Sequence, residues 1–303
     1  MPSRANASAS SSSAAKPARR ARSGVGPVTP HLYVPTAARP VRAKLVPLRT
    51  DVHVVPHSHP WGQIAFSSTG VARLTVEHGT FIVPPSRALW VPPGVEHAVT
   101  VVEATELHTL YIHQPRGRCG PQVARTDEAA WRQCRVLEVS DLLRALALQM
   151  DTRPDGPGLR LSAEQRRRER RLADLVLDEL RRAKPVRLGV DLPADKRLRT
   201  LCEAVLENPA RHATLEAWAR DSGASPRTVA RLFRHQLNTS FAQWRQQVVL
   251  AKAVALAARK RPMSLIASEL GYASASAFTA MVRRSVGMPP SRFFASVQST
   301  TRE

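Results

Sequence analysis

The sequence predicts an α+β multidomain protein in which an N-terminal β-barrel is joined by linker helices to an all-α C-terminal domain. Three observations predict this class. Short β-prone runs broken by Gly and Pro fill residues 44–113, and capped segments with helical periodicity begin at Ser140. The pattern of helix, tight turn and helix then occurs twice, at residues 215–234 and 264–284. A chain of 303 residues is long enough for about two domains.

The first 30 residues are rich in Ala, Ser, Pro and Arg and carry no apolar periodicity. This composition predicts a disordered basic tail over residues 1–30. A targeting leader rich in Arg and Ser has a similar composition, so that alternative stays open. No apolar segment of the kind that secretion needs is present, and no run of 18 apolar residues occurs. We therefore expect a cytoplasmic protein without a membrane partner.

Residues 31–137 are predicted to form the barrel. Its expected strands are residues 63–66, 71–77, 80–83, 88–91, 97–102 and 108–112. Short strands at nearly regular spacing are typical of a sandwich or barrel. Apolar and polar residues alternate within 71–77, which indicates one buried face, and residues 77–80 supply a hairpin turn.

Three histidines mark a candidate site in this domain. His57 and His59 are two residues apart, which places them on the same face of a strand. His97 ends the segment Trp90-Val-Pro-Pro-Gly-Val-Glu-His97. The arrangement resembles the double motif of cupin barrels, in which a His-x-His precedes a carboxylate and a Pro-x-Gly-x-x-His follows. Gln63 stands where metal-binding cupins usually carry the carboxylate.

Two kinds of site fit His57, His59, Gln63 and His97. Three imidazoles with water can hold a divalent metal of the late first transition row. Alternatively, the four side chains line a metal-free pocket for a small-molecule effector, or pack in the barrel mouth. Catalysis is disfavoured, because the carboxylate is missing and no separate nucleophile–base pair is visible. We therefore expect a sensing domain rather than an enzyme.

Residues 138–190 are predicted to be linker or dimerisation helices. Ser140 is a favourable N-cap, and Ser162 has the capping-box spacing to Gln165 ahead of a charged helix that reaches about Ala183. The apolar stripe of this helix consists of Leu172, Leu175, Val176 and Leu180. The stripe packs either on the barrel or on the same helix of a second copy, which would make a homodimer. Two prolines and a loss of periodicity place the domain boundary in residues 184–193.

Residues 191–303 are predicted to form the second domain, which begins with an amphipathic helix over 198–206. In the first helix-turn-helix unit, Gly223 suits the turn, Ser225 caps the second helix and Pro226 fits its first turn. The outward residues of that helix are Arg227, Thr228, Arg231 and Arg234. Arginine pairs with guanine edges in the major groove, so these residues are candidate DNA contacts.

The second unit repeats the first with an offset of 49 residues between Ser225 and Ser274. Its outward residues are Ser274, Ser276, Thr279, Arg283 and Arg284. This smaller, hydroxyl-rich surface favours phosphate contacts over base reading. A helix over about 240–259 is expected as a rigid connector that fixes the spacing of the two units.

The net charge of +21 supports a polyanionic partner. Residues 196–303 hold 17 of the 45 Lys and Arg but only 6 of the 24 Asp and Glu. A field of this sign attracts DNA and makes binding salt-dependent, although it carries no sequence specificity. Double-stranded promoter or operator DNA is therefore the expected partner.

Residues 196–294 resemble the DNA-binding domain of the AraC/XylS family of transcriptional regulators. The resemblance is carried by Gly271-Tyr-Ala-Ser-Ala-Ser-Ala-Phe278 and Gly287-Met-Pro-Pro-Ser-Arg-Phe293. Residues 57–63, 90–97 and 240–247 are similar to the YeaM/NimR-like branch of that family. The resemblance implies a bacterial regulator whose barrel senses an effector or dimerises. It also implies promoter binding beside RNA polymerase and, in some members, control of a neighbouring transporter gene.

Two alternatives belong to other classes. A cupin-type metal-dependent enzyme fused to a DNA-targeting domain would show bound metal and turnover, and Gln63 disfavours it. A DNA-repair methyl acceptor needs a clustered, zinc-activated cysteine. Cys119, Cys134 and Cys202 are instead scattered and odd in number, which also disfavours a disulfide framework.

Overall fold

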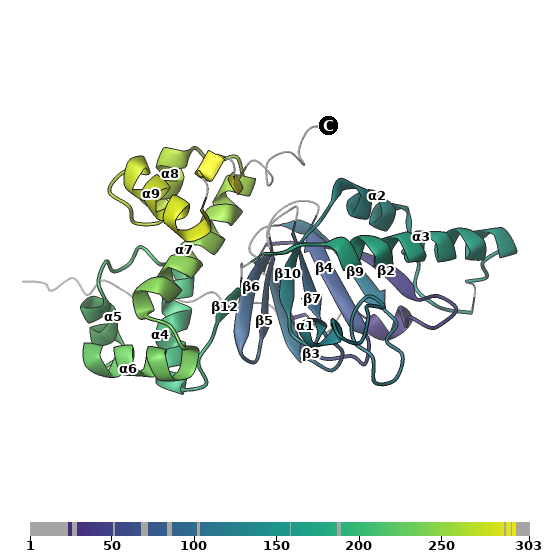
Figure 1. Ribbon diagram of the computed structural model, residues 1–303, viewed down its shortest axis with the longest axis horizontal. Helices are drawn as coiled ribbons and strands as arrows, with labels where there is room; N and C mark the ends of the chain where they lie inside the picture. Colours follow the sequence, from purple (N-terminus) through teal and green to yellow (C-terminus); the bar gives the residue numbers. More distant parts are fainter. Residues whose placement is uncertain are drawn as a thin grey trace, which may run out of the picture.

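The computed structural model describes residues 24–25, 29–50, 52–67, 72–83, 87–101, 104–157, 159–186, 189–287, 289–291 and 293–294. Most of the predicted basic tail over residues 1–30 lies outside the described residues. The strands lie between two groups of helices, one from the middle and one from the end of the chain (Figure 1). Within the described residues, every helix is too short or too polar to span a membrane.

Two six-stranded sheets make up the N-terminal part. The first has the order β1 (Gly24–Val25), β3 (His53–His57), β8 (His97–Val101), β5 (Ala72–Val76), β6 (Gly79–Val83) and β12 (Gly189–Asp191). The second has the order β11 (Pro185–Val186), β10 (Arg135–Glu138), β7 (Arg87–Val91), β4 (Gly62–Ser67), β9 (Thr105–Ile112) and β2 (Val41–Leu48). Among the described strands no ladder joins the two sheets, so the predicted barrel is not closed by hydrogen bonds.

All six predicted strands are present, with ends shifted by at most a few residues. Val76 pairs with Gly79, which confirms a hairpin with a two-residue turn at Glu77 and His78. The strands β2 and β10 were not predicted, and β3 was expected only as the strand that carries His57. Proline interrupts both β2, at Pro47, and β3, at Pro56, which removes the usual strand signal.

Helices α2 (Asp141–Gln149) and α3 (Ala163–Arg182) cover the second sheet, after the short α1 (Glu128–Trp131). The predicted caps are confirmed: Ser140 Oγ accepts from the Leu143 N–H, and Ser162 and Gln165 form a reciprocal capping box. The packed residues of α3 are Ala173, Val176, Leu177 and Leu180, with Leu172 partly buried. The stripe therefore packs on the sheet.

Leu175 is a correction to the predicted stripe of α3, because 49% of its surface is exposed. Ala173, Val176 and Leu180 share one helical face at spacings of three and four residues, and Leu175 lies off that face. Residues 184–193 are also more regular than expected. They form β11, which pairs with β10, and β12, which pairs with β6, so this stretch passes from one sheet to the other.

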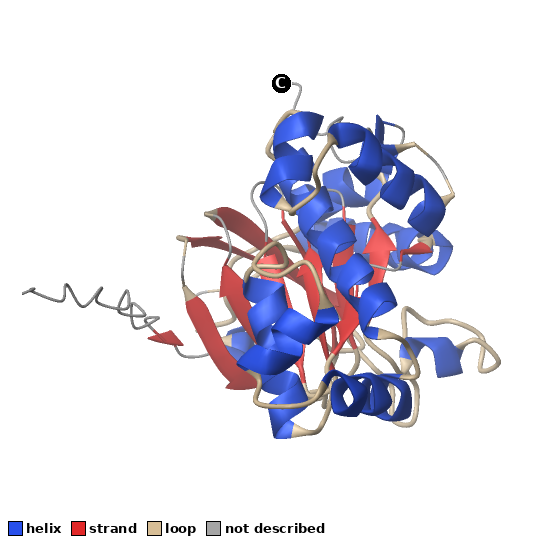
Figure 2. Ribbon diagram, turned by 90° about the vertical axis from the view of Figure 1, so that its left-hand side faces the viewer, coloured by secondary structure: helices blue, strands red, loops and turns tan. Residues whose placement is uncertain are grey.

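The C-terminal part contains α4 (Lys196–Glu207), α5 (Leu215–Asp221), α6 (Pro226–Leu237), α7 (Phe241–Ala258), α8 (Met263–Glu269) and α9 (Ala275–Val286). Both predicted helix-turn-helix units are thus confirmed, as α5–α6 and α8–α9. The connector α7 begins with a second capping box, formed by Ser240 and Gln243. The two units lie at opposite ends of α7 (Figure 1), and this helical group stands in front of the sheets in Figure 2.

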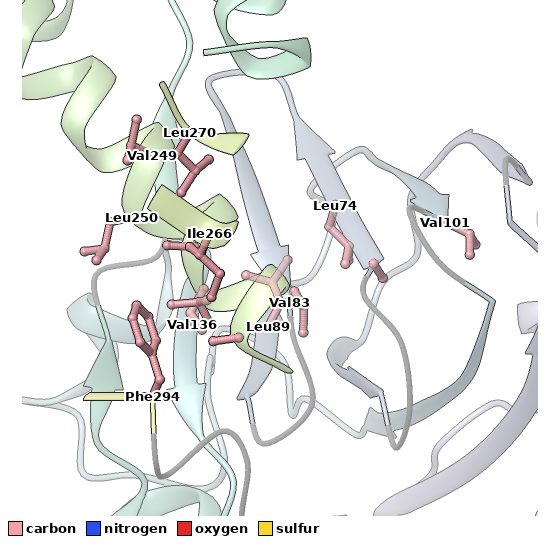
Figure 3. Close-up of a cluster of buried hydrophobic side chains, with 14 of the residues drawn as sticks. Leu74, Val83, Leu89, Val101, Val136, Val249, Leu250, Ile266, Leu270 and Phe294 are labelled. Atoms are coloured by element: carbon pink, nitrogen blue, oxygen red, sulfur yellow. The ribbon is translucent and has the colours of Figure 1, made fainter. Parts of the chain in front are cut away.

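One continuous apolar cluster joins the C-terminal helices to the interior of the sheets. It contains Leu74, Val83, Leu89, Val101 and Val136 from the strands and Val249, Leu250, Ile266, Leu270 and Phe294 from the C-terminal part (Figure 3). Ile82 of β6 also packs against Ala251 of α7. Two hydrogen bonds reinforce the contact: Trp244 Nε1 donates to the Asp191 carbonyl at 2.7 Å, and the Arg199 guanidinium donates to the Glu77 carbonyl at 2.7 Å. The two parts therefore share a core.

Candidate nucleic-acid interface and effector site

The first helix-turn-helix unit is held by a glycine turn and a serine cap. Gly223 has a φ of 66°, a conformation that favours glycine, and the Ala224 N–H donates to the Ala219 carbonyl at 3.1 Å. Ser225 Oγ then accepts from the Thr228 N–H at 3.1 Å, which starts α6. Val229 and Phe233 are buried, so the opposite side of α6 faces outward.

The second unit repeats this construction with a turn that is one residue longer. Gly271 has a φ of 79°, and the Tyr272 N–H donates to the Ala267 carbonyl at 2.9 Å. Ser274 Oγ accepts from the Ala277 N–H at 3.1 Å and starts α9. The serines that cap the second helices, Ser225 and Ser274, keep the predicted offset. The turn glycines that follow the first helices, Gly223 and Gly271, have an offset that is one residue smaller. Ala273 is the additional residue between turn and cap.

The predicted DNA contacts lie on the accessible sides of α6 and α9. Thr228 and Thr279 are half-buried, and the exposed members are Arg227, Arg231, Arg234, Ser274, Ser276, Arg283 and Arg284. Within the described part of the chain, none of these five arginines forms an ion pair with a carboxylate. Their guanidinium groups therefore keep all their donors for phosphates or base edges.

Three of the predicted contact hydroxyls already serve the helix caps. Thr228 Oγ1 lies 2.9 Å from Ser225 Oγ, and Ser276 Oγ lies 2.8 Å from Ser274 Oγ. A hydroxyl can donate one hydrogen bond and accept two, so each retains capacity for a phosphate oxygen. Thr228, Ser274 and Ser276 therefore stabilise the start of the helices whether or not they contact DNA.

The three predicted site histidines lie together at one end of the sheets. The ring centroids of His57 and His97 are 4.3 Å apart, and those of His59 and His97 are 5.2 Å apart. His59 lies in the loop after β3 rather than in the strand, because Pro60 has no N–H with which to continue the ladder. The Nδ1 atoms of His57, His59 and His97 lie 2.9, 2.8 and 3.0 Å from the carbonyls of Val55, Trp61 and Val95.

Gln63 completes the cluster through His59. The His59 Nε2 atom lies 2.8 Å from Oε1 of the Gln63 side-chain amide, and both residues are buried. Burial lowers the pKa of His59, and it lowers the pKa of His97 to about 4, so both rings are neutral near pH 7. A neutral ring that donates from Nδ1 needs a donor at Nε2. The Gln63 NH2 group supplies that donor when the amide is rotated by 180° from the orientation that places Oε1 at the ring.

These residues do not fit a divalent metal. Among the residues that the structure describes, no group of three or more His, Cys, Asp or Glu is placed to hold an ion. The His59 Nε2 atom, which a metal would need, is occupied by Gln63. Trp61 stacks on the His59 ring, with centroids 5.2 Å apart, and Tyr111 meets the same ring edge-on. Aromatic walls and neutral polar groups suit an organic ligand better than a metal.

Sequence reasoning missed four polar residues beside this cluster: Tyr33, Arg42, Lys44 and Tyr111. All four are buried, with exposures between 1% and 8%. A signal was available, because Val41 and Ala43 alternate with Arg42 and Lys44 in a pattern typical of a strand. Cations in a strand ordinarily face solvent, whereas Arg42 and Lys44 are buried.

Burial disfavours the thiolate form of the three cysteines. All three are free, and Cys119 and Cys202 are buried. Burial raises the pKa of Cys119 and Cys202, and it raises the pKa of Cys134 to about 12. A thiol with a raised pKa is a poor nucleophile and a poor zinc ligand at neutral pH.

Comparison with known proteins agrees with this architecture. A model described as "AraC-like ligand binding domain" matches residues 47–180, and one described as "Helix-turn-helix domain" matches residues 218–296. The chain is 31% identical over 241 residues to the HTH-type transcriptional regulator NimR of Escherichia coli, covering 79% of this chain and 81% of NimR. It is 34% identical over 102 residues to the HTH-type transcriptional regulator RipA of Corynebacterium glutamicum, covering 34% of this chain and 31% of RipA.

Among solved structures, ToxT of Vibrio cholerae overlaps 85% of this chain and 98% of its own. The overlap has a TM-score of 0.33 and 8% identity, so no feature of ToxT is transferred. The similarity to NimR extends over both parts of the chain and exceeds what a shared helix-turn-helix unit alone would give. The chain therefore belongs to the AraC family of DNA-binding transcriptional regulators, with an N-terminal ligand-binding domain and a C-terminal helix-turn-helix domain.

Proposed function

We propose that this regulator reads promoter DNA with the exposed sides of α6 and α9 and changes its occupancy when an effector binds between the sheets. The observation that carries the proposal is the repeated unit, in which two capped helices each present arginines without carboxylate partners within the described residues. The proposed contacts are Arg227, Thr228, Arg231, Arg234, Ser274, Ser276, Thr279, Arg283 and Arg284.

The two helices have different roles in this proposal. The arginines of α6 begin in its first turn, where side chains reach base edges, so α6 reads sequence. The start of α9 carries serines and its arginines lie near the end, which suits phosphate contacts. The connector α7 has 18 residues and a length of about 27 Å. Units at its two ends suit major-groove segments that are one turn, ~34 Å, apart.

The effector site is proposed at His57, His59, Gln63 and His97, without a metal. Neutral imidazoles and an amide offer hydrogen bonds, and Trp61 and Tyr111 offer aromatic walls. The shared core gives a route for the response, because α7 packs on β6 and β12 and carries a helix-turn-helix unit at each end. A ligand that moves the sheet edge would therefore reorient both units.

The proposal also includes partners, a target gene and a location. A homodimer is proposed through α3, where Leu175 is exposed beside a face already packed on the sheet. RNA polymerase is proposed as the partner at the promoter, a neighbouring transporter gene as a target, and the cytoplasm as the location. The expectation that the chain is not an enzyme stays a prediction, as do the domain limits 31–137, 138–190 and 191–303.

A footprint of the full-length protein tests the proposal. The DNA would be the region upstream of its own gene and of the neighbouring genes, with excess nonspecific competitor. Discrete protection with two major-groove contacts one turn apart is expected. Diffuse, salt-sensitive protection without a boundary would show that positive charge alone drives binding, and would reject the proposal.

A further inference from the structure

The loop over residues 208–213 joins α4 to α5 and is attached to the first helix-turn-helix unit at two points. The Trp218 indole N–H donates to the His212 carbonyl at 3.0 Å. The side chains of Arg211 and His212 each lie 2.8 Å from Asp221 Oδ2, at the end of α5. A displacement of this loop would therefore displace the first unit with it.

The same loop touches the turn of the second unit. Gly271 has a φ of 79°, and a Cβ atom at this position would lie 3.1 Å from both Cα and Cβ of Ala210. That approach is closer than an ordinary van der Waals contact. Gly223, the corresponding glycine of the first unit, has a φ of 66°, and no atom of the described residues lies within 4 Å of its Cβ position. The close approach is therefore a feature of the second turn alone.

Arg245 of α7 holds the loop in this position. Its guanidinium donates twice to the Pro209 carbonyl, from Nε at 3.1 Å and from Nη2 at 2.6 Å. Hydrogen bonds from a charged donor are stronger than those between neutral groups. Burial raises the pKa of Tyr272, and the positive charges of Arg245 and Arg284 oppose that rise, which indicates that Arg245 lies near the second unit.

Two further side chains of α7 attach the connector to its neighbours. Lys252 donates to the Glu207 carbonyl at the end of α4, at 2.6 Å. The Gln246 amide donates to Ser285 Oγ on α9, at 2.8 Å. Lys252 thus ties α7 to α4, and Gln246 ties α7 to the second unit. Arg245 differs from both, because its hydrogen bonds end on the loop that contacts the two units.

We propose that Arg245 and Gly271 set the orientation of the first unit relative to the second, and thereby the operator spacing that the protein accepts. Both are positioning residues, because they act through the loop over residues 208–213 and not on DNA. Two readers held in one orientation favour one spacing of their sites, whereas loosely oriented readers tolerate several. The inference rests on the proposed reading of promoter DNA and names the residues that determine its spacing specificity.

The distance between the two units in the free, full-length protein tests the orientation without DNA. Spin labels on non-natural residues would replace His235 of α6 and Ser268 of α8, which are both exposed. Pulsed electron resonance should give one narrow distance distribution for the protein that is otherwise wild type. Arg245→Met and Gly271→Ala should each broaden or shift it. Arg245→Lys, which can donate a single bond to the carbonyl, should give an intermediate width.

Gly223→Ala and Arg220→Met are the matched controls. Gly223→Ala introduces a similar strain at positive φ but meets no described neighbour, and Arg220→Met removes an exposed arginine of α5. Both should leave the distribution close to that of the wild type. Adding Ala210→Gly to Gly271→Ala removes one of the two close atoms and should restore part of the narrow distribution.

Two results would overturn the inference. One is a distribution that stays unchanged in Arg245→Met or in Gly271→Ala. The other is a broadening in Gly223→Ala as large as that in Gly271→Ala. A cooperative melting curve for each variant shows that the protein compared is folded.

Binding to spaced operators connects the orientation with specificity. The DNA is the fragment that the footprint protects, compared with versions in which one or two base pairs are inserted between the two protected segments. The wild type should prefer the native spacing by about tenfold, and Arg245→Met should reduce that preference by about threefold. A variant that is only less stable would lose affinity for every fragment and keep the preference.

The two proposals can fail separately. Absence of a discrete footprint would reject the proposed function, while the distance measurement still decides the role of Arg245 and Gly271. A discrete footprint with an unchanged distance distribution supports promoter binding and rejects the inference. A broadened distribution with an unchanged spacing preference would reject the effect on operator spacing.

Discussion

The Nε2 atom of His59 lies 2.8 Å from the side-chain amide of Gln63, so the position of the cupin carboxylate is filled by a neutral partner. Gln63→Glu would place a negative charge there and stabilise the imidazolium. We expect the pKa of His59, which burial now lowers, to rise in this variant because the carboxylate favours the charged ring. An NMR titration of the imidazole signals measures it. Gln63→Met is the control, and an unchanged pKa in Gln63→Glu would contradict the contact.

Arg231 lies exposed on α6. We expect Arg231→Ala to weaken operator binding by ~1–3 kcal/mol and to relax discrimination at one base position. Fluorescence anisotropy with a set of single-base operator variants measures both effects. Arg197→Ala is the matched control, because Arg197 is equally exposed but lies on α4, outside the helix-turn-helix units. Equal weakening on every sequence would assign Arg231 to a phosphate instead.

Lys44 should make stability depend on pH in a defined window. Its pKa is about 8 in the folded state and near 10.5 when unfolded, so the unfolded state holds more protons between these values. Stability therefore rises with pH across pH 8 to 10.5, and the full penalty acts below pH 8. Lys252, whose pKa is also lowered to about 8 by burial, acts in the same window.

Chemical denaturation of the wild type and Lys44→Met at several pH values measures the contribution of Lys44. Subtracting the two curves removes the part that comes from Lys252, because both proteins retain it. We expect the variant to be the more stable protein at pH 7 and the difference to shrink toward pH 10.5. A difference that is constant with pH would show that Lys44 is not desolvated.

Trp244 ties α7 to β12 through its indole N–H and the Asp191 carbonyl. Trp244→Phe keeps an aromatic ring in the core but leaves this carbonyl without its donor. We expect a loss of ~1–2 kcal/mol in the free energy of unfolding, measured by urea denaturation. A changed slope of the unfolding free energy against urea concentration, with the midpoint unchanged, would instead indicate that the two parts had separated.

Leu175 is the exposed leucine of α3 and the proposed dimer contact. We expect Leu175→Glu to shift the protein from dimer to monomer in sedimentation velocity. The thermal unfolding midpoint of the monomer should stay unchanged. Leu265→Glu, which changes a leucine of 36% exposure on α8, is the control for the added charge. A dimer that survives Leu175→Glu would place the contact elsewhere.

Local chemistry determined which parts of this fold the sequence could predict. Serine caps at Ser140, Ser162 and Ser225 are short-range signals, and all three helices begin where predicted. The alternation around Ala72 and Leu74 identified a half-buried strand correctly. In contrast, β11 and β12 are two- and three-residue strands that exist because neighbouring edges offer hydrogen bonds. Their partner strands are distant in sequence, so no local pattern predicts β11 or β12.

The candidate sites were predictable to different degrees. Exposed arginines at fixed helical positions follow directly from the cap and the buried face of α6, so their placement was predictable. The histidine cluster was found from its motif. The burial of Lys44 was not, because a lysine in a strand is ordinarily solvent-facing, and the contact of Lys44 with the Tyr33 ring joins segments that no local pattern connects. Gln63 was recognised as a missing carboxylate, but its bond to His59 required the structure.

The contact of α7 with β6 and β12 limits how this chain can be divided. Val249, Leu250 and Phe294 complete the same cluster as Leu89 and Val136. Cutting the chain ahead of α4 would leave apolar surfaces on both products, so neither half is an interchangeable module. Attaching these DNA-reading helices to a different sensing domain would require that domain to supply a matching edge.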